Sequence, residues 1–316
     1  MTATCPITSS FPRWRFSGRS EPLAWGGIGT IGTTTLQGST TVPGVKKVTL
    51  TQNLNETIQV AELQAFEVVT GTNVAQQSNG GVATATSVGY GGAATRANDG
   101  NTSGSWGNAS IWHSDEWDKP GATLTIALAN PTTLQNLKFY GRTDCCQTRQ
   151  NDFTINLLDA SNSVLLTKQV IGMGSAPGAT GTIDMSGAPT GEDAAALLSG
   201  VDYEFEVDAL TSAYDMLSVA GAGAGLPTAL YLNGANLVVT TVAGTIAENT
   251  VLDLLDADKI YGQFAGISLP GDRLSWDLSQ LYTTGQITAV PEPATMALLG
   301  LAAAGLGGYI RRRRTA

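Results

Sequence analysis

Short stretches in which apolar and polar residues alternate constrain the fold of this chain more than any other feature. Thr123–Leu128 and Phe153–Leu158 alternate cleanly, and Val164–Val170 follows after a polar turn. An alternation of period two places every second side chain on one face, so each stretch predicts a half-buried β-strand. We expect a turn at Pro131–Thr133, before the strand that leads to Arg142. The 38 glycines also favour short strands and tight turns over helices, and the sequence therefore predicts an all-β protein.

The segment Tyr140–Arg149 carries the densest polar chemistry in the chain. It reads Tyr-Gly-Arg-Thr-Asp-Cys-Cys-Gln-Thr-Arg, with alternating stretches before and after it. It is therefore expected to be a loop between two strands, at one end of a sheet. A guanidinium is a rigid fork of donors, so Arg142 and Arg149 would converge on a ligand rich in oxygen acceptors. Asp144 can hold the guanidinium of Arg142 in one rotamer. The alternative is that Arg-x-Asp forms an ordinary surface ion pair, which contributes little.

Two adjacent cysteines within this loop leave three interpretations open. Neighbouring Cα atoms are about 3.8 Å apart, below the usual disulfide range of roughly 4.4–6.8 Å. A bond between Cys145 and Cys146 would close a tight ring with a small, flat, apolar surface. The alternatives are a reduced, buried pair and half of a metal site, although no second cysteine pair or histidine cluster completes a zinc site. A sugar matches the first interpretation, because it offers hydroxyls on its edge and C–H groups on one face.

The pattern Arg142-x-Asp144-x4-Arg149, with two cysteines inside it, resembles the sugar-binding loop of fucolectins. These are the F-type lectin branch of the factor 5/8 C-terminal, discoidin-like superfamily. In that family an upstream histidine completes the polar triad, and the only histidine here, His113, lies upstream. The runs Ala97–Asn101 and Ser110–His113 also resemble the family's Asp-Gly-Asn … Ser-x-x-His pattern.

This resemblance covers residues 45–186 and implies a galactose-binding-like jelly-roll β-sandwich that binds a fucose-like sugar. The implied sugar ligands are His113, Arg142 and Arg149, with Asp144 orienting Arg142 and a Cys145–Cys146 disulfide stacking on an apolar sugar patch. Three tryptophans, Trp106, Trp112 and Trp117, cluster in the sequence around the histidine. Such residues are more often core than ligand platform, and Trp112, next to His113, is the first candidate for a ligand contact.

The same resemblance implies a structural calcium ion, held by hard oxygen ligands. Carried over, the ligands are Asp99, Asn101 and Ser110, with a carbonyl from Arg96. The family's last strand supplies a further carboxylate, but here a matching segment precedes the motif instead. We therefore hypothesise a circularly rearranged sandwich, in which residues 47–67 fill the last-strand position and Glu62 reaches the metal. The alternative is a plain edge strand with Glu62 in water.

The end of the chain carries a second specific pattern. Pro291-Glu292-Pro293 precedes residues 294–310, which carry no charge, and four arginines follow, Arg311, Arg312, Arg313 and Arg314. As a helix, residues 294–310 would rise about 25 Å, at the short edge of what spans a bilayer, with the arginines cytoplasmic. This order resembles the PEP-CTERM sorting signal of Gram-negative bacteria. The resemblance implies a transmembrane helix at 294–310, an exosortase-type transpeptidase as partner, and export through an inner-membrane intermediate to the surface or extracellular matrix.

The remaining segments complete the predicted domain organisation. Residues 1–44 are interpreted as a linker or disordered arm without the apolar core of a secretory signal. This conflicts with the export that the tail implies, and a misplaced start codon or a truncated upstream region would resolve the conflict. Residues 187–204 are a predicted linker with one or two helical turns at Glu192–Leu198. Residues 205–288 contain short apolar runs between turns and resemble the strand-rich repeat beside autotransporter passengers. A short solenoid or a small sandwich would fit them. The sorting tail is 289–316.

Charge and composition narrow the class of function. The formal charge is −9 despite the four terminal arginines, and no basic patch is present, which argues against nucleic-acid binding. No carboxylate spacing singles out an acid/base pair, so no enzymatic activity is expected. The sequence predicts an exported, non-catalytic, calcium-stabilised sugar-binding protein. Two alternatives remain: a structural exopolysaccharide or biofilm protein with a non-binding lectin-like domain, and a carbohydrate-active enzyme.

Overall fold

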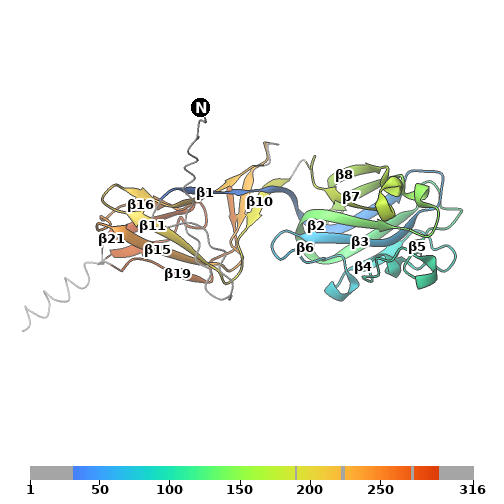
Figure 1. The fold of residues 1–316 in the computed structure, drawn as a ribbon, viewed down its shortest axis with the longest axis horizontal. Helices are drawn as coiled ribbons and strands as arrows, with labels where there is room; N and C mark the ends of the chain where they lie inside the picture. The colour runs from blue at the N-terminus through green and yellow to red at the C-terminus, as the bar shows by residue number, and fades with distance from the viewer. Residues whose placement is uncertain (1–30, 189–190, 222–224, 272–273, 292–316) are drawn as a thin grey trace, which may run out of the picture. The chain divides into compact units, whose positions relative to one another are not determined.

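The computed structural model describes residues 31–188, 191–221, 225–271 and 274–291. Apart from single turns of 3-10 helix, these residues form only strands and loops, so the chain is all-β as predicted (Figure 1). Two compact units are distinguished. The sandwich unit consists of residues 37–196 and 220–229, and the ladder unit consists of the described parts of 1–36, 197–219 and 230–316.

One long strand organises the sandwich unit. The first half of β6 (Thr123–Gly141) pairs antiparallel with β2 (Ser39–Gln52) and β4 (Val82–Ala85). Its second half pairs antiparallel with β3 (Gln59–Glu67) and β9 (Thr180–Asp184). Because β6 is common to both sets, it passes from one sheet into the other.

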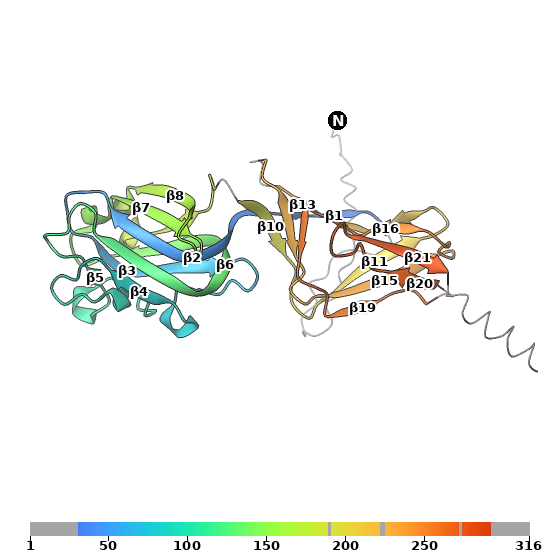
Figure 2. The ribbon, with the colours of Figure 1, turned by 180° about the vertical axis from the view of Figure 1, so that it is seen from behind.

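The other strands extend these two sheets. β7 (Asp152–Leu158) pairs with β2, and β8 (Val164–Ile171) with β7, which gives the order β8-β7-β2-β6-β4. β5 (Trp112–His113) pairs with β3, which gives the order β9-β6-β3-β5. Figure 2 shows β7 and β8 beside β2, with β3 and β5 in the other sheet.

The inward faces of the two sheets share one core. Phe139 of β6 and Phe153 of β7 stack with ring centroids 4.9 Å apart, one from each sheet. The alternating apolar residues of both sheets lie fully or almost fully buried in the same cluster. Close packing of two antiparallel sheets makes this unit a β-sandwich, as the sequence predicts.

The structure corrects the predicted turn at Pro131–Thr133. β6 runs through Pro131 without ending. A proline lacks the N–H that a sheet ladder needs. In the pairing with β2, Ala127 lies opposite Lys47, and the next paired residue of β6 is Thr132, opposite Val45. The register shifts between these two pairs. The proline therefore lies where the ladder is irregular and no donor is required of it.

Two segments interpreted as linkers contain strands. Within the predicted arm 1–44, β1 (Thr33–Gln37) and the first residues of β2 are extended, while residues 1–30 lie outside the described part of the chain. Within 187–204, β10 (Glu192–Ala196) is a strand and not the predicted helical turn. It pairs antiparallel with the start of β2, Glu192 opposite Thr41. A strand partner satisfies the backbone of both segments, which propensity alone did not reveal.

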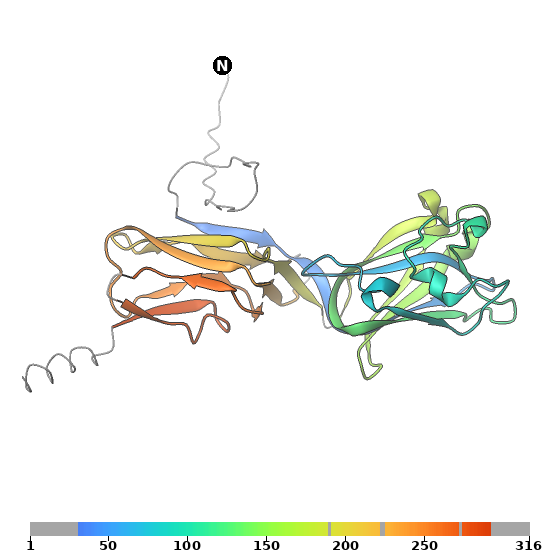
Figure 3. The ribbon, with the colours of Figure 1, turned by 90° about the horizontal axis from the view of Figure 1, so that it is seen from below.

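The ladder unit contains parallel pairings between strands that are distant in sequence. β11 (Asp202–Asp208), β15 (Asn236–Ala243) and β19 (Gly266–Ser268) stack in parallel, and β13 (Met216–Ala220) pairs in parallel with β17 (Leu255–Asp256). Figure 3 shows the strands of this unit, yellow to red, side by side. Repeated parallel stacking is typical of a solenoid, but other strands of this unit pair antiparallel, so both expected architectures stay predictions.

Shorter strands complete the chain. These are β12 (Ala213–Tyr214), β14 (Thr228–Tyr231), β16 (Val251–Asp253), β18 (Lys259–Tyr261), β20 (Leu274–Asp277) and β21 (Gln286–Pro291). Among the described residues, no helix has the length and apolar character needed to cross a bilayer. The predicted transmembrane helix 294–310 lies outside the residues that the structure describes.

The packing between the sheets predicts where a truncation will be most damaging. Phe139→Ala would empty a fully buried site where the sheets meet, and we expect unfolding free energy to fall by about 3–5 kcal/mol in chemical denaturation. The matched control is Val164→Ala, at an exposed position of β8, which should change stability by less than about 0.5 kcal/mol. Equal effects of the two variants would contradict the shared core.

Candidate functional site

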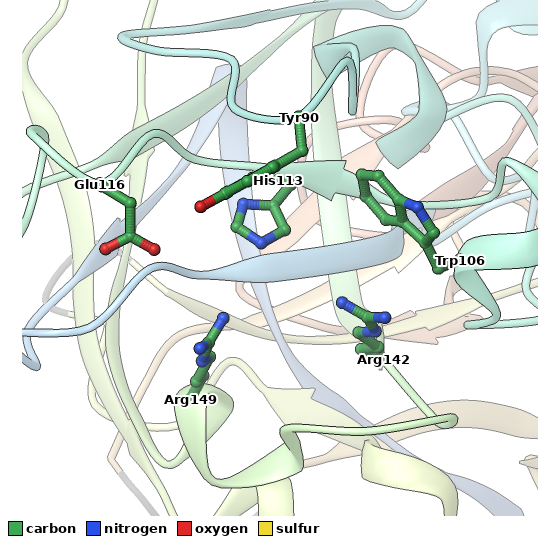
Figure 4. A pocket seen from close by; sticks show the side chains of 6 residues that line it. All are labelled: Tyr90, Trp106, His113, Glu116, Arg142 and Arg149. Atoms are coloured by element: carbon green, nitrogen blue, oxygen red, sulfur yellow. The ribbon is translucent and has the colours of Figure 1, made fainter.

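A surface pocket of about 330 Å³ lies among the loops of the sandwich unit. Its lining side chains are Tyr90, Trp106, His113, Glu116, Arg142 and Arg149 (Figure 4). They come from the loop after β4, the 3-10 turn η3 (Trp106–Asn108), the end of β5 and the loop after it, the end of β6, and the turn η4 (Gln147–Gln150). The structure thus brings together the three predicted residues His113, Arg142 and Arg149.

Asp144 fixes Arg142 and Trp106 in one arrangement. Its Oδ1 accepts a hydrogen bond from Nε of Arg142 at 2.5 Å, and its Oδ2 accepts one from the backbone N–H of Trp106 at 2.9 Å. The Arg142 guanidinium lies over the Trp106 ring, 5.4 Å from the centroid. The hydrogen bond from Arg142 is the main reason why the pKa of Asp144 is lowered. Asp144 therefore has the orienting position that the motif predicts, although it does not line the pocket itself.

The connection between β2 and β3 holds Arg149. Its Nη1 donates to Oγ1 of Thr57 at 2.9 Å, and its Nε lies 3.7 Å from Oε2 of Glu56. Its backbone carbonyl accepts from the side-chain amide of Gln52 at 2.8 Å. The guanidinium is therefore positioned by a strand connection that is remote in sequence, and the end of β2 holds the backbone of the same residue. Figure 4 shows the two arginines on one side of the pocket and the His113 ring between them and Tyr90.

His113 lines the pocket but uses both ring nitrogens inside the protein. Nδ1 lies 2.6 Å from the carbonyl oxygen of Ser114, and because that oxygen can only accept, Nδ1 carries the proton. Nε2 is then an acceptor, and it lies 2.8 Å from the Gln59 amide nitrogen. Burial lowers the pKa of His113 first, and the charges of Arg149 and Arg142 lower it further. The imidazole is thus neutral and presents its ring, which departs from the expected role as a polar sugar ligand.

Aromatic residues rather than cysteines form the apolar wall of the pocket. Tyr90 and Trp106 contact the His113 ring edge to face, with centroids 5.0 and 5.8 Å away. The sulfur atoms of Cys145 and Cys146 contact each other, but neither residue is among those that line the pocket. The expected stacking of a disulfide on the sugar therefore has no support in this geometry.

The tryptophan prediction is also corrected. Trp112 is fully buried, and its indole N–H donates to the carbonyl of Ser87, so it belongs to the core. Trp106 is the tryptophan at the pocket, because the carboxylate of Asp144 anchors its backbone there. Sequence spacing placed Trp112 next to His113, but neighbouring residues on a strand point to opposite faces.

Sequence reasoning missed Tyr90 and Glu116. Tyr90 has a φ of 52°, in the left-handed region that a bulky aromatic residue rarely adopts. A Cβ on Gly89 or Gly92 would come within 2.7 Å of the backbone of residues 113–114, so only glycine fits on either side of it. The run Gly89-Tyr90-Gly91-Gly92 was therefore a usable signal, since backbone constraints of this kind gather at functional sites. Glu116 had no comparable signal.

Glu62 is buried beside the loop that carries the other predicted calcium ligands. Its strand β3 is paired on both sides, by β5 and β6, and its side chain is fully buried, so the alternative of an edge strand with Glu62 in water is wrong. Oε2 accepts from the backbone N–H of Gly100 at 3.1 Å, while Oε1 has no hydrogen-bond partner within the described residues. Burial raises the pKa of Glu62 to about 7; the charge of Asp99 adds to this, and the Gly100 N–H opposes it.

The loop beside Glu62 contains the other residues predicted to bind calcium. Asp99 Oδ1 accepts from the N–H of Asn101 at 2.8 Å, and Ser110 is buried with its hydroxyl bonded to Ser103 and Ser105. Arg96 stands in the turn η2 (Ala94–Ala97) that precedes the loop. Within the described residues, no three His, Cys, Asp or Glu side chains are grouped to hold a metal. Any ion here would need carbonyl, amide or hydroxyl oxygens in addition to the carboxylates of Glu62 and Asp99, and oxygen ligands of this kind suit calcium.

Two segments of the chain match known family models. Residues 96–191 match the model of the NedA-like, galactose-binding domain of F5/8 type C, and residues 289–314 match the PEP-CTERM protein-sorting motif. No curated protein and no solved structure matches the chain. The first match contains five of the six lining residues of the pocket.

The chain therefore contains a galactose-binding-like domain of the F5/8 type C kind together with a sorting motif. The domain is of a carbohydrate-binding type, and the motif indicates export and sorting toward the cell envelope or surface.

The single histidine gives a direct test of the pocket's electrostatics. Its ring signals in NMR should titrate below the ordinary pKa of about 6.5, because burial and two arginines disfavour the charged form. Since the folded chain binds this proton less readily than the unfolded chain, the histidine also contributes stability that is lost as the pH falls below about 6.5.

Arg142→Ala removes one positive charge and should raise the pKa of His113. Lys47→Ala, at a partly exposed position of β2 where the ammonium donates to Asn162, should leave that pKa unchanged. A pKa at or above 6.5 in the unaltered chain would show that the ring is not held as described.

Proposed function

We propose that this chain is an exported, non-catalytic lectin whose pocket binds a terminal fucose-like sugar. The observation that carries the proposal is the pair of oriented guanidinium groups, Arg142 and Arg149, beside the aromatic wall of Tyr90 and Trp106. Guanidinium donors suit the hydroxyls and ring oxygen of a sugar, and aromatic faces suit its C–H groups. The motif around Arg142 that resembles fucolectins supports a sugar of the fucose type.

The roles of the remaining motif residues follow from their positions. Asp144 would position Arg142 and Trp106 before the ligand arrives, so that less side-chain freedom is lost on binding. We propose that Cys145 and Cys146 form a disulfide that stiffens the loop between the two arginines, in an oxidising compartment. His113 would contribute its ring as part of the pocket floor.

Calcium would stabilise the loop next to the pocket. The proposed ligands are Glu62, Asp99, Asn101 and Ser110, with a carbonyl of Arg96. Oε1 of Glu62 is buried without a hydrogen-bond partner in the described part of the chain, and Asp99 lies nearby. A bound cation would offset the free-energy cost of burying this carboxylate. The ion would supply positive charge there and take no part in sugar recognition.

The sorting motif adds a proposed route and partner. Pro291 ends β21, while Glu292, Pro293, the predicted membrane helix and the four arginines lie outside the described residues. We propose that an exosortase-type transpeptidase acts on this tail after membrane insertion, and that the protein is destined for the cell surface or extracellular matrix.

The pocket gives no support to a hydrolytic activity. Its six lining residues include one carboxylate, Glu116, whereas glycoside hydrolysis ordinarily uses a pair that flanks the scissile bond. Binding without turnover is therefore the expected behaviour.

A glycan array with the full chain, in calcium, tests the proposal. Fucosylated or similar deoxy-sugar glycans should bind. Arg142→Ala should reduce binding about ten- to hundredfold, the loss expected when a bound ligand loses a charged hydrogen-bond donor. The matched control is Lys138→Ala, outside the pocket. No glycan bound by a folded chain would favour the alternative of a structural matrix protein with a non-binding domain.

Calcium removal provides a separate test. The melting temperature of the full chain should fall on chelation, because an ion bound only by the folded state stabilises by about 2.7 kcal/mol at a hundredfold excess over its dissociation constant. Glu62→Gln should reduce this response, while Glu248→Gln, on the exposed surface of the ladder unit, should retain it. A melting temperature that does not change on chelation would contradict the proposed calcium site.

A further inference from the structure

We infer that the pocket selects electrically neutral sugars over acidic ones, and that Glu116 determines this selectivity by accepting a hydroxyl hydrogen from the ligand. The inference rests on the proposed lectin function and adds the charge class of its ligand. It arises from a residue that lies outside the arginine motif, in the loop after β5.

Two arginines in a pocket would ordinarily favour an anionic ligand, such as a uronic acid or another carboxylated sugar. Here each cation around the pocket already faces a carboxylate. The ion pairs are Arg142–Asp144 at 2.5 Å, Arg149–Glu56 at 3.7 Å and Lys119–Glu116 at 2.7 Å. Three positive and three negative side chains leave no formal charge to attract an anion, and His113 is neutral.

Glu116 is the carboxylate that lines the pocket itself. Its hydrogen bond to Lys119 lowers its pKa, so it stays ionised and can only accept hydrogen bonds. A sugar hydroxyl can donate to it, whereas a ligand carboxylate would be repelled by it. Figure 4 shows Glu116 and the Tyr90 hydroxyl on one side of the pocket and Trp106 with Arg142 on the other.

The pocket therefore offers the ligand hydrogen-bond donors from the arginines and a hydrogen-bond acceptor from Glu116. The arginines donate, so they require sugar oxygens that accept, and Glu116 accepts, so it requires at least one free hydroxyl. A sugar hydroxyl can do both at once, because it has one donor and two acceptor positions. Neutral sugars with neighbouring free hydroxyls satisfy these demands together, and a carboxylate satisfies only the arginines.

Matched sugar pairs test the inference with the full chain in calorimetric titrations. The probes are methyl α-L-fucoside and methyl α-L-galacturonide, which differ only in a methyl group or carboxylate at C6, and the corresponding pair methyl β-D-galactoside and methyl β-D-galacturonide. The neutral member should bind at least about tenfold more tightly, which corresponds to ~1.4 kcal/mol.

Glu116→Gln keeps the size of the side chain and removes its charge. Affinity for the neutral sugar should fall several-fold, affinity for the acidic sugar should rise, and the ratio between them should shrink toward one. Glu248→Gln, an exposed change in the ladder unit, should leave both affinities unchanged. A variant that weakens both sugars equally would give Glu116 a merely structural role and overturn the inference.

The failures of the two proposals are distinguishable. If the unaltered chain binds the acidic sugars as tightly as the neutral ones, or more tightly, the selectivity is wrong and the lectin function stands. If a folded chain binds none of the four sugars and no glycan on the array, the lectin function is wrong and the selectivity falls with it.

Discussion

The sharing of β6 between two sheets is the constraint on which the sandwich unit depends. Its first half pairs within one sheet and its second half within the other, and both sheets close over one core that contains Phe139. The same strand ends at Gly141, directly before Arg142. A strand that is paired on both sides thus sets the position of a pocket residue. The loops around the pocket then need to supply only direct contacts to its side chains.

These contacts are mostly hydrogen bonds and ion pairs, and they hold long side chains that would otherwise change rotamer freely. One carboxylate orients both an arginine and a tryptophan backbone, and the β2–β3 connection holds the second arginine. Fixing donors before the ligand arrives lowers the entropy lost on binding. Because both arginines are already paired with carboxylates, their electrostatic attraction for an anionic ligand is reduced. Recognition then depends on the positions of the hydrogen-bond donors and the aromatic rings. In this account a sugar binds because several weak contacts are in place, not because the pocket carries charge.

The sequence predicted the parts of this structure that depend on local pattern. Alternation gave the strands, and the rare spacing of Arg142, Asp144 and Arg149 indicated the pocket. Prediction from the sequence failed where pairing with a distant strand determines the secondary structure. The alanines and acidic residues of β10 form a strand because β2 supplies a partner. Trp112 was the wrong tryptophan because chain proximity to His113 says nothing about which face a side chain takes. Tyr90 and Glu116 reach the pocket only through tertiary contacts, although the glycines around Tyr90 hinted at a constrained backbone.

The most direct test of the central claim uses His113 as a reporter, because it is the only histidine and it lines the pocket. The measurement is an NMR titration of the full chain with methyl α-L-fucoside in calcium, in which the ring signals of His113 are followed. The account predicts that these signals shift progressively and saturate with the same affinity that calorimetry reports. Saturable binding that leaves the His113 signals unmoved would place the sugar elsewhere and contradict the account.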